Sequence, residues 1–432
     1  MRIREYNASL DKRAELLVYY TEKQNSDMET KKETKKNTRL LSLDTLRGFD
    51  MLFIMGFAPL VVALNALHPT AVGDVIAGHM RHVPWDGFTQ HDMIFPLFLF
   101  VAGISFPFSL AKQRGSGSSD KHIYLRVFRR GVTLVLLGFL YNGFLQLNFP
   151  DVRLASVLGR IGLAWMLGAF IYMSLKKSVQ YGLIVFILVG YWLLLAFVPA
   201  PDAAGASPLS IEGNLVGYID RHCLPGKLIC GNFDPEGLLS TLPAIVTALL
   251  GIYAGEIVRS TRLGSGERKS LLLSGIGVVL VAIGLVWNTV FPINKMLWSS
   301  SFTCFVGGLS FLLFALFYYI VDVKGWKSWT LFFRVIGLNS ITIYLAQQVV
   351  GFSHMNKFLF GGMSQWVGEC AGEHHLPHPG GAGRPDLPLQ KGDRGAGADR
   401  DHPRGGCLCL LRHPHRLYRR GGPDQDPGRR KL

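Results

Sequence analysis

The sequence predicts an all-α integral membrane protein, a helical bundle of nine or ten transmembrane helices. Hydrophobic residues make up 49% of the 432 positions, and the mean hydropathy is positive at +0.26. The apolar residues are grouped in blocks of roughly twenty, the length a helix needs to cross a hydrocarbon core of about 30 Å. A transmembrane barrel would instead show short alternating segments, which this sequence lacks.

The expected spans follow one another from the first apolar block to the last. Polar connections separate the spans, whose edges are placed to within several residues. They are 48–67, 93–111, 127–147, 154–174, 179–198, 238–258, 271–291, 302–321 and 330–350.

Charge assigns the two sides of the membrane. The formal net charge is +15, but the lysines and arginines concentrate in alternate connections, as expected for loops on the cytoplasmic side. The remaining connections are mostly acidic. We therefore expect a multi-pass protein of the cell (inner or plasma) membrane with a cytoplasmic N-terminus. This pattern explains the basic composition, so we exclude nucleic acid as a partner.

The two ends of the chain differ from the apolar middle. Residues 1–40 have no apolar core and predict a disordered cytoplasmic leader rather than a signal peptide. Residues 41–366 form the expected transmembrane domain. Residues 367–432 are crowded with Gly, Pro, Arg and His, a composition that cannot bury a core and predicts disorder. We interpret this aberrant tail as read out of frame, in place of a final helix.

Cysteine and histidine spacing gives little sign of a metal site. Cys407 and Cys409 lie in the tail near several histidines, but no spacing typical of a zinc site appears. We therefore expect no metal. Cys223 and Cys230 lie in an outer loop, where either a disulfide or two thiols is compatible with the sequence.

The segment 81–92 carries the strongest chemical signal. It is polar and aromatic, lies between the apolar runs Met51–Leu67 and Met93–Leu110, and contains His82 and Asp92. Histidine exchanges protons near neutral pH, with an unperturbed pKa of about 6.5. A nearby carboxylate can fix its tautomer and support the imidazolium. The competing interpretation is a solvated loop histidine without function.

Other polar residues border the spans, where ionisable groups are costly and usually paired or functional. Asp44 and Arg47 are three residues apart on one helix face and can pair. Arg160 lies deep enough in its span to need a partner or an anionic ligand. Asp234 is a candidate N-cap of the following span. For Trp298, a place in an interfacial aromatic belt is as good an interpretation as a functional role.

At these residues the chain resembles the heparan-α-glucosaminide N-acetyltransferase family and its bacterial relatives. The Leu-Asp-x-x-Arg-Gly piece alone also recurs in other membrane acyltransferases, but the full set is specific. The matching pieces, in the family's order, are Leu43–Gly48, His82–Thr89 with Asp92 and Phe95-Pro96, Val157–Gly162, Asp234–Leu239, Pro292–Ser299 and Gly337–Ile341.

The resemblance implies a transmembrane acetyltransferase. It would move an acetyl group from cytoplasmic acetyl-CoA to the amine of a terminal glucosamine-like sugar on the far side of the membrane, without a metal. His82 would be the catalytic base or acyl carrier, and Asp92 would belong to the same site. The longer connection before His82 and the missing last hydrophobic segment depart from the family pattern.

Further site residues are expected on the same grounds. The acceptor sugar would meet a set of polar and aromatic residues near the outer face: Trp85, Asp86, Asp234, Glu236, Asn294, Lys295 and Trp298. Acetyl-CoA would meet Arg47, Arg160, Asn339 and Ser340, in a tunnel lined partly by Arg160 and Asn339. Basic residues at the inner mouth (Arg47, Arg126, Arg129, Arg130) are candidates for its phosphates.

Two alternatives stay open at this stage. One is a proton-coupled transporter, whose His and Asp relays would also lie at membrane depth. The other is an O-acyltransferase that acts on a cell-wall or surface glycan. The expected partners are the lipid bilayer and an amino sugar or glycan, and the sequence does not decide between a monomer and a homodimer.

Overall fold

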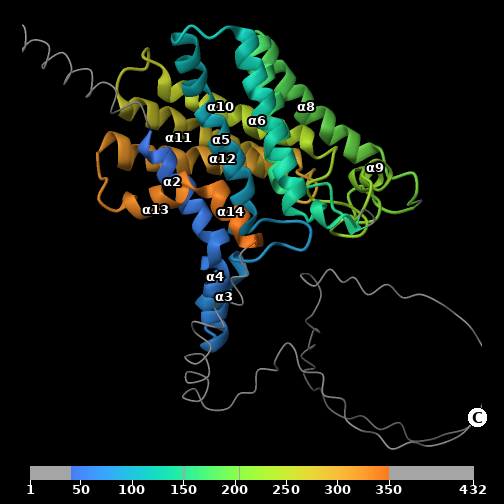
Figure 1. The fold of residues 1–432 in the computed structure, drawn as a ribbon. Coiled ribbons are helices and arrows are strands. Elements are labelled where there is room, and N and C mark those ends of the chain that lie inside the picture. The colour runs from blue at the N-terminus through green and yellow to red at the C-terminus, as the bar shows by residue number, and fades with distance from the viewer. Residues whose placement is uncertain (1–39, 149–150, 204, 350–432) are drawn as a thin grey trace, which may run out of the picture.

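The computed structural model describes residues 40–148, 151–203 and 205–349. Over these residues the chain is a bundle of helices with no strand, as the sequence predicts (Figure 1). The leader 1–40 lies outside the described residues except for Leu40. So do the end of the predicted membrane domain, the tail 367–432 and any tenth helix.

The helices follow the predicted order. Each predicted span corresponds to at least one helix, and two short helices, α4 and α9, lie in the connections. The bounds are α2 (Leu41–Leu52), a π-helical turn (Phe53–Phe57), α3 (Ala58–Leu67), α4 (Ala71–His79), α5 (Gln90–Gly115), α6 (Asp120–Tyr141), a 3₁₀ turn (Phe144–Gln146), α7 (Val157–Ser174), α8 (Lys177–Phe197), α9 (Leu215–Cys223), α10 (Thr241–Arg259), α11 (Gly266–Trp287), α12 (Ser300–Phe317), a second π-helical turn (Tyr318–Val323), α13 (Thr330–Leu338) and α14 (Ser340–Val349).

Seven helical segments in the described part of the chain are long and apolar enough to cross a membrane. They are Leu41–Leu67, Gln90–Gly115, Val157–Ser174, Lys177–Phe197, Thr241–Arg259, Gly266–Trp287 and Ser300–Val323. The predicted segments 127–147 and 330–350 are also helical, but they differ from these seven. α6 carries three arginines in its first half, and α13 and α14 are short helices separated by a break at Asn339.

The first span is interrupted where the sequence predicted a continuous helix. Gly56 has φ +140° inside the π-helical turn, and Pro59 follows at the start of α3. Proline has no N–H for the helical ladder, and glycine tolerates the positive φ. The carbonyl of Ile54 accepts a hydrogen bond from Gln347 of α14 (3.3 Å). Beyond this turn, α3 and α4 project from the bundle (Figure 1).

The centre of the bundle is the pair α5 and α10, whose residues are mostly buried. The two backbones approach closely because glycines lie between them. A Cβ atom added at Gly251 would lie 2.0 Å from the carbonyl oxygen of Phe100. Around this pair, α7 and α12 add large apolar side chains such as Trp165 and Phe302 to one continuous core.

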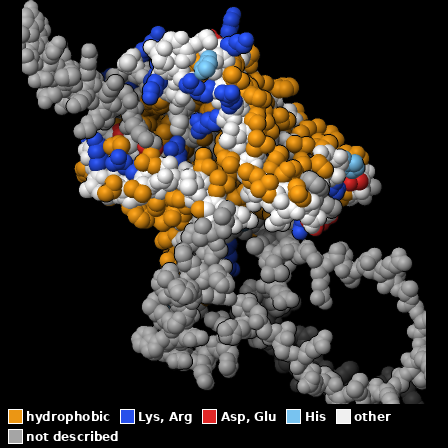
Figure 2. All heavy atoms as spheres, in the orientation of Figure 1, with side chains coloured by type: hydrophobic (Ala, Val, Ile, Leu, Met, Phe, Trp, Pro, Cys, Tyr) orange, Lys and Arg blue, Asp and Glu red, His pale blue; other side chains and the backbone are white. Residues whose placement is uncertain are grey.

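The two ends of the bundle differ in charge. The basic end holds the α5–α6, α7–α8, α10–α11 and α12–α13 connections and includes Lys112, Lys121, Lys176, Arg259 and Lys324. Blue side chains gather at this end in Figure 2, above a broad hydrophobic surface on α6 and α8. The acidic end holds the other connections and includes Asp86, Asp151, Asp202, Asp220 and Asp234.

Candidate active site

The loop between α4 and α5 is fixed to the start of α5 by a capping box. The backbone N–H and the hydroxyl of Thr89 both donate to Oδ2 of Asp92 (3.1 and 2.9 Å). This arrangement satisfies donors that the first turn of a helix leaves without partners. Oδ2 of Asp92 therefore caps the start of α5, whereas Oδ1 points toward the loop.

That second oxygen contacts His82. The distance from Oδ1 of Asp92 to Nδ1 of His82 is 2.6 Å. The Asp92 side chain is fully buried, whereas 41% of the His82 side chain is exposed. The ring of His91 lies beside that of His82, with centroids 4.5 Å apart. A buried carboxylate that fixes one imidazole nitrogen leaves the other available for proton transfer, which is the arrangement of a catalytic dyad.

A second loop, residues 288–299 between α11 and α12, is attached to the His82 loop. The N–H of Gly87 donates to the carbonyl of Ile293 (2.8 Å). The side-chain amide of Asn294 donates to Asp86 (3.0 Å). These contacts join segments more than 200 residues apart, so the sequence could not show them directly.

The second loop brings Lys295 onto the dyad. Its Nζ lies 3.0 Å from Nδ1 and 3.3 Å from Nε2 of His82. It also lies 3.5 Å from Oδ1 of Asp92, and its side chain is 11% exposed. Burial lowers the pKa of the Lys295 ammonium below its usual range, although the negative charges of Asp92 and Glu236 oppose this shift.

The two tryptophans expected to bind substrate lie in different surroundings. Trp85 is half-buried, and its indole N–H donates to the carbonyl of Leu209 (2.9 Å). Trp298 is 1% exposed and packs edge-on against Phe95, with centroids 5.0 Å apart. The structure therefore places Trp298 in the core and not on a substrate-facing surface. Its φ of +51° is uncommon for a residue other than glycine.

Asp234 and Glu236 form an ion cluster with Arg153. Nε and Nη2 of Arg153 donate to the two oxygens of Asp234 (2.7 and 2.6 Å), and Nη2 also donates to Glu236. Asp234 is completely buried. The expectation that Asp234 caps the following helix is wrong, because α10 begins at Thr241 after Ser240. The six residues between are an irregular turn that the cluster holds in place.

Asp220 on α9 binds the backbone of the same turn. Its two oxygens accept hydrogen bonds from the N–H groups of Asp234 (3.2 Å) and Leu238 (3.0 Å). Burial raises the pKa of Asp220 to about 6, even though these two hydrogen bonds act in the opposite direction.

Arg160 is 2% exposed and faces this turn. Its Nη2 donates to the carbonyl of Gly237 (3.1 Å) and to the hydroxyl of Ser240. Its guanidinium also lies over the ring of Trp298, 5.1 Å from the centroid. Among the described residues, Nη2 of Arg160 is therefore hydrogen-bonded, whereas its buried Nε and Nη1 have no hydrogen-bond partner. Arg160 is not among the residues that line the cavity described next, contrary to the expected tunnel lining.

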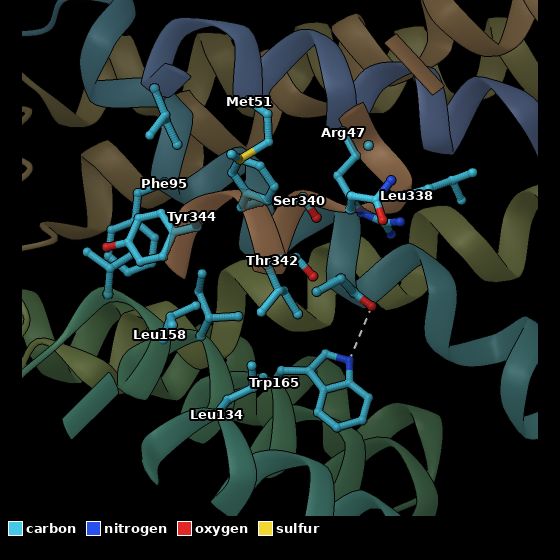
Figure 3. A pocket seen from close by; sticks show the side chains of 18 of the residues that line it. Arg47, Met51, Phe95, Leu134, Leu158, Trp165, Leu338, Ser340, Thr342 and Tyr344 are labelled. Atoms are coloured by element: carbon cyan, nitrogen blue, oxygen red, sulfur yellow. Dashed lines mark hydrogen bonds between the residues drawn. The ribbon is translucent and has the colours of Figure 1, made fainter. Parts of the chain in front are cut away.

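A cavity of about 400 Å³ lies between α2, α5, α6, α7, α13 and α14. Ligand pockets commonly have volumes of about 300–1,000 Å³. Figure 3 shows Arg47 and Leu338 at one side of this cavity and Phe95 and Tyr344 at the opposite side. Asn339 and Ser340 also line it, at the break between α13 and α14. Three of the four residues expected to bind acetyl-CoA therefore share one cavity.

Arginines occupy the end of the cavity nearer the basic end of the bundle. Arg47 donates to Asp44 (3.3 Å), the partner that the sequence predicted, and also to the hydroxyl of Ser105 (3.2 Å). Arg130 lines the cavity with its guanidinium 4.3 Å from the ring centroid of Trp165. Arg126 and Arg129 do not line it.

The other end of the cavity lies near the dyad. Phe95, which lines the cavity, follows Asp92 by one turn of α5, a rise of about 5 Å. The sequence assigned no role to Phe95, Thr89 or Tyr344. The Thr-x-x-Asp spacing before an apolar run could have revealed the cap at Thr89, and Phe95 belongs to a matching family piece, but no local signal identifies Tyr344.

Cys223 carries a free thiol, so the disulfide with Cys230 that the sequence allowed is not formed.

The family of proteins described as heparan-alpha-glucosaminide N-acetyltransferase, catalytic, matches residues 39–285. The chain belongs to this family. The human heparan-alpha-glucosaminide N-acetyltransferase is 28% identical over 367 residues, covering 72% of this chain and 53% of the human protein. The mouse protein of the same name is 27% identical over 377 residues, covering 74% of this chain and 55% of its own length. The chain thus spans about half the length of the curated relatives it matches.

Membership of the heparan-alpha-glucosaminide N-acetyltransferase family confirms the resemblance inferred from the sequence motifs. The matched region contains the His82–Asp92 dyad, the Arg153–Asp234–Glu236 cluster and most of the cavity wall. The loop that carries Lys295 and the helices α13 and α14 lie beyond residue 285.

Proposed function

We propose that this chain is a transmembrane N-acetyltransferase. It moves an acetyl group from acetyl-CoA to the amine of a terminal glucosamine-like sugar. The observation that carries the proposal is the half-exposed imidazole of His82 on the buried carboxylate of Asp92, one helical turn from a cavity with arginines at its far end. The names of the human and mouse relatives support the same reaction.

The proposed orientation puts the basic end in the cytoplasm of a cell-membrane protein, together with the N-terminus. The concentration of Lys and Arg at that end supports this orientation. Acetyl-CoA then enters from the cytoplasm. Arg47 and Arg130 bind its anionic groups, Asn339 and Ser340 contact its polar arm, and the thioester lies toward Phe95.

The acceptor sugar approaches His82 from the acidic end. In direct transfer, the amine nitrogen attacks the thioester carbonyl carbon, and His82 takes the proton that the amine loses. The bond from carbon to sulfur then breaks, and CoA leaves as a thiolate that is reprotonated. Asp86 and Trp85 lie on the loop that carries His82 and are the proposed acceptor contacts there. Asp234, Glu236 and Arg153 shape the neighbouring turn.

In the carried-acyl route, His82 attacks the thioester first and holds the acetyl group before the amine takes it. Rapid mixing of the protein with radiolabelled acetyl-CoA in the absence of acceptor separates the two routes. Label retained on the protein, and lost in His82→Ala, favours the carried-acyl route. A chain that never acquires label, although it turns over when the sugar is added, uses direct transfer.

The function itself is tested by acetyl-CoA consumption with a panel of glucosamine-ended sugars and matched hydroxyl acceptors. The parent chain is compared with His82→Ala and with a control, His79→Ala, whose side chain is exposed on α4. We expect consumption that needs the amine, is abolished by His82→Ala and is unchanged in the control. Equal consumption in the parent and His82→Ala would reject the assignment. Transfer to hydroxyl acceptors alone would indicate an O-acyltransferase.

A further inference from the structure

Lys295 contacts the catalytic dyad and is poorly placed to bind a sugar. Its Nζ lies within 3.3 Å of both ring nitrogens of His82 and 3.5 Å from Asp92. Only 11% of its side chain is exposed, compared with 41% for His82. The amine of Lys295 is therefore largely buried and lies against the imidazole of His82.

The 288–299 loop holds Lys295 in this position through the residues on either side of it. Oδ1 of Asn294 accepts the N–H of Leu297 (2.9 Å), and the N–H of Trp298 donates to the carbonyl of Lys295 (3.0 Å). The N–H of Asn294 donates to the hydroxyl of Ser299, which also caps α12. Because this turn is attached to Asp86 and Gly87 of the other loop, the contact with His82 is specified by the backbone.

The charged and titratable groups that face His82 come from two elements. From α5 these are the carboxylate of Asp92 and the ring of His91, and from the 288–299 loop it is the ammonium of Lys295. On the loop of His82 itself, Asp86 is hydrogen-bonded to Asn294. The charges of Glu236 and Arg160 act in turn on Lys295.

These charges oppose each other at the imidazole. A carboxylate at 2.6 Å, acting alone, favours the protonated ring, which cannot accept a proton from an amine. An ammonium beside the same ring disfavours the second positive charge. Lys295 also neutralises much of the negative charge of Asp92, so Asp92 can fix the ring's orientation without holding it protonated.

We propose that Lys295 is a positioning residue that keeps His82 unprotonated by offsetting the charge of Asp92. This inference rests on the proposed acetyl transfer through His82. It replaces the expectation that Lys295 binds the acceptor. The two roles predict different effects of a substitution. Loss of a residue that binds the sugar raises the KM for the acceptor, whereas loss of a charge that acts on His82 changes the pH dependence of kcat/KM.

The test compares Lys295→Met with Lys295→Arg, which keeps the charge, and with the control Lys227→Met, an exposed lysine in the loop that precedes α10. The pH profile of kcat/KM reports the essential base of the free enzyme. In Lys295→Met we expect the acidic limb of this profile to move to higher pH by about one unit, the lower end of the shift that an adjacent charge produces. Lys295→Arg and Lys227→Met should keep the parent's limb.

A second measurement needs neither acetyl-CoA nor a sugar. Diethylpyrocarbonate modifies unprotonated imidazole, and peptide fragmentation locates the product at His82 or His91. The pH midpoint for modification of His82 should rise in Lys295→Met by the same amount as the acidic limb. Size-exclusion chromatography of each variant checks that the protein is folded, and Lys295→Gln serves if the Met variant does not fold.

The outcomes separate this inference from the proposed function. A raised midpoint with a shifted acidic limb supports the role of Lys295. An unchanged midpoint, with only the acceptor KM increased, overturns it and restores the substrate-binding role. If the parent transfers no acetyl group, the proposed function fails, while the modification midpoint still decides whether Lys295 controls the protonation of His82.

Discussion

Replacement of Asp92 by Asn tests the dyad with the least disturbance of the fold. Asparagine has the same shape, and its carbonyl oxygen can still accept the two hydrogen bonds from Thr89 that begin α5. The amide then faces Nδ1 of His82 in place of the carboxylate, so the ring loses both its fixed tautomer and the support for its positive charge.

The size of the effect follows from burial and exposure. When His82 takes the acceptor's proton it becomes an imidazolium paired with the buried Asp92 carboxylate, and removal of one partner of such a pair costs about 3–5 kcal/mol. His82 is 41% exposed, and solvent screens part of this interaction, so we discount the cost to about 2–3 kcal/mol. At 1.36 kcal/mol for each factor of ten, kcat should fall by about 10²-fold.

The assay is the initial rate of CoA release, followed with a thiol reagent on purified parent, Asp92→Asn and the control Asp151→Asn. Asp151 is exposed in the loop between α6 and α7. Thermal unfolding of each protein checks that the fold is retained. A folded Asp92→Asn variant that keeps more than about a third of the parent's kcat would refute a catalytic dyad, because so small a loss is less than 1 kcal/mol.

Three further predictions concern stability, each measured by thermal unfolding in detergent. Arg153→Gln leaves the buried Asp234 without its cation and should destabilise the protein by about 3 kcal/mol; a loss below 1 kcal/mol would contradict the ion cluster. Gly251→Ala puts a Cβ 2.0 Å from a backbone oxygen of α5 and should prevent stable folding, whereas Gly182→Ala, with nothing within 4 Å, should change stability by less than about 1 kcal/mol. The pKa of Asp220 is raised by burial to about 6, so its carboxyl favours the folded state below pH 4 and loses that contribution as the pH rises to 6. The stability of the parent relative to Asp220→Asn should therefore fall by about 2–3 kcal/mol across this range, and a constant difference would show that this carboxyl is not the titrating group.

The sequence predicts the order of the helices from local patterns and places Asp92 with His82 through the family resemblance, while the catalytic role of this pair stays a prediction. Apolar blocks mark the spans, and His82 and Asp92 are ten residues apart on either side of a helix start. The sequence does not show which way a polar side chain on a buried helix points. Arg160 was expected to line the cavity, but it faces Ser240, because the turn after Asp234 supplies its partner.

Contacts between distant segments account for the other differences. The inward position of Lys295 depends on the pairing of Asn294 with Asp86, which are 208 residues apart. The shape of the cavity depends on the break at Asn339 and on the close approach of α2 to α13, where a Cβ at Gly48 would lie 1.7 Å from a backbone oxygen of Phe333. The close approach of α2 to α13 has no signal in its own neighbourhood of the chain.

The carboxylate of Asp92 serves two purposes at once, since it both starts a membrane-crossing helix and holds the imidazole. A substitution that loosens the first turn of α5 will therefore also displace the imidazole of His82. Few substitutions should be tolerated at that turn. The 288–299 loop is constrained as well, because Phe291–Ser299 are mostly buried and Ser299 both caps α12 and accepts the N–H of Asn294. Variants designed to change the proposed acceptor should accordingly leave the beginnings of α5 and α12 untouched.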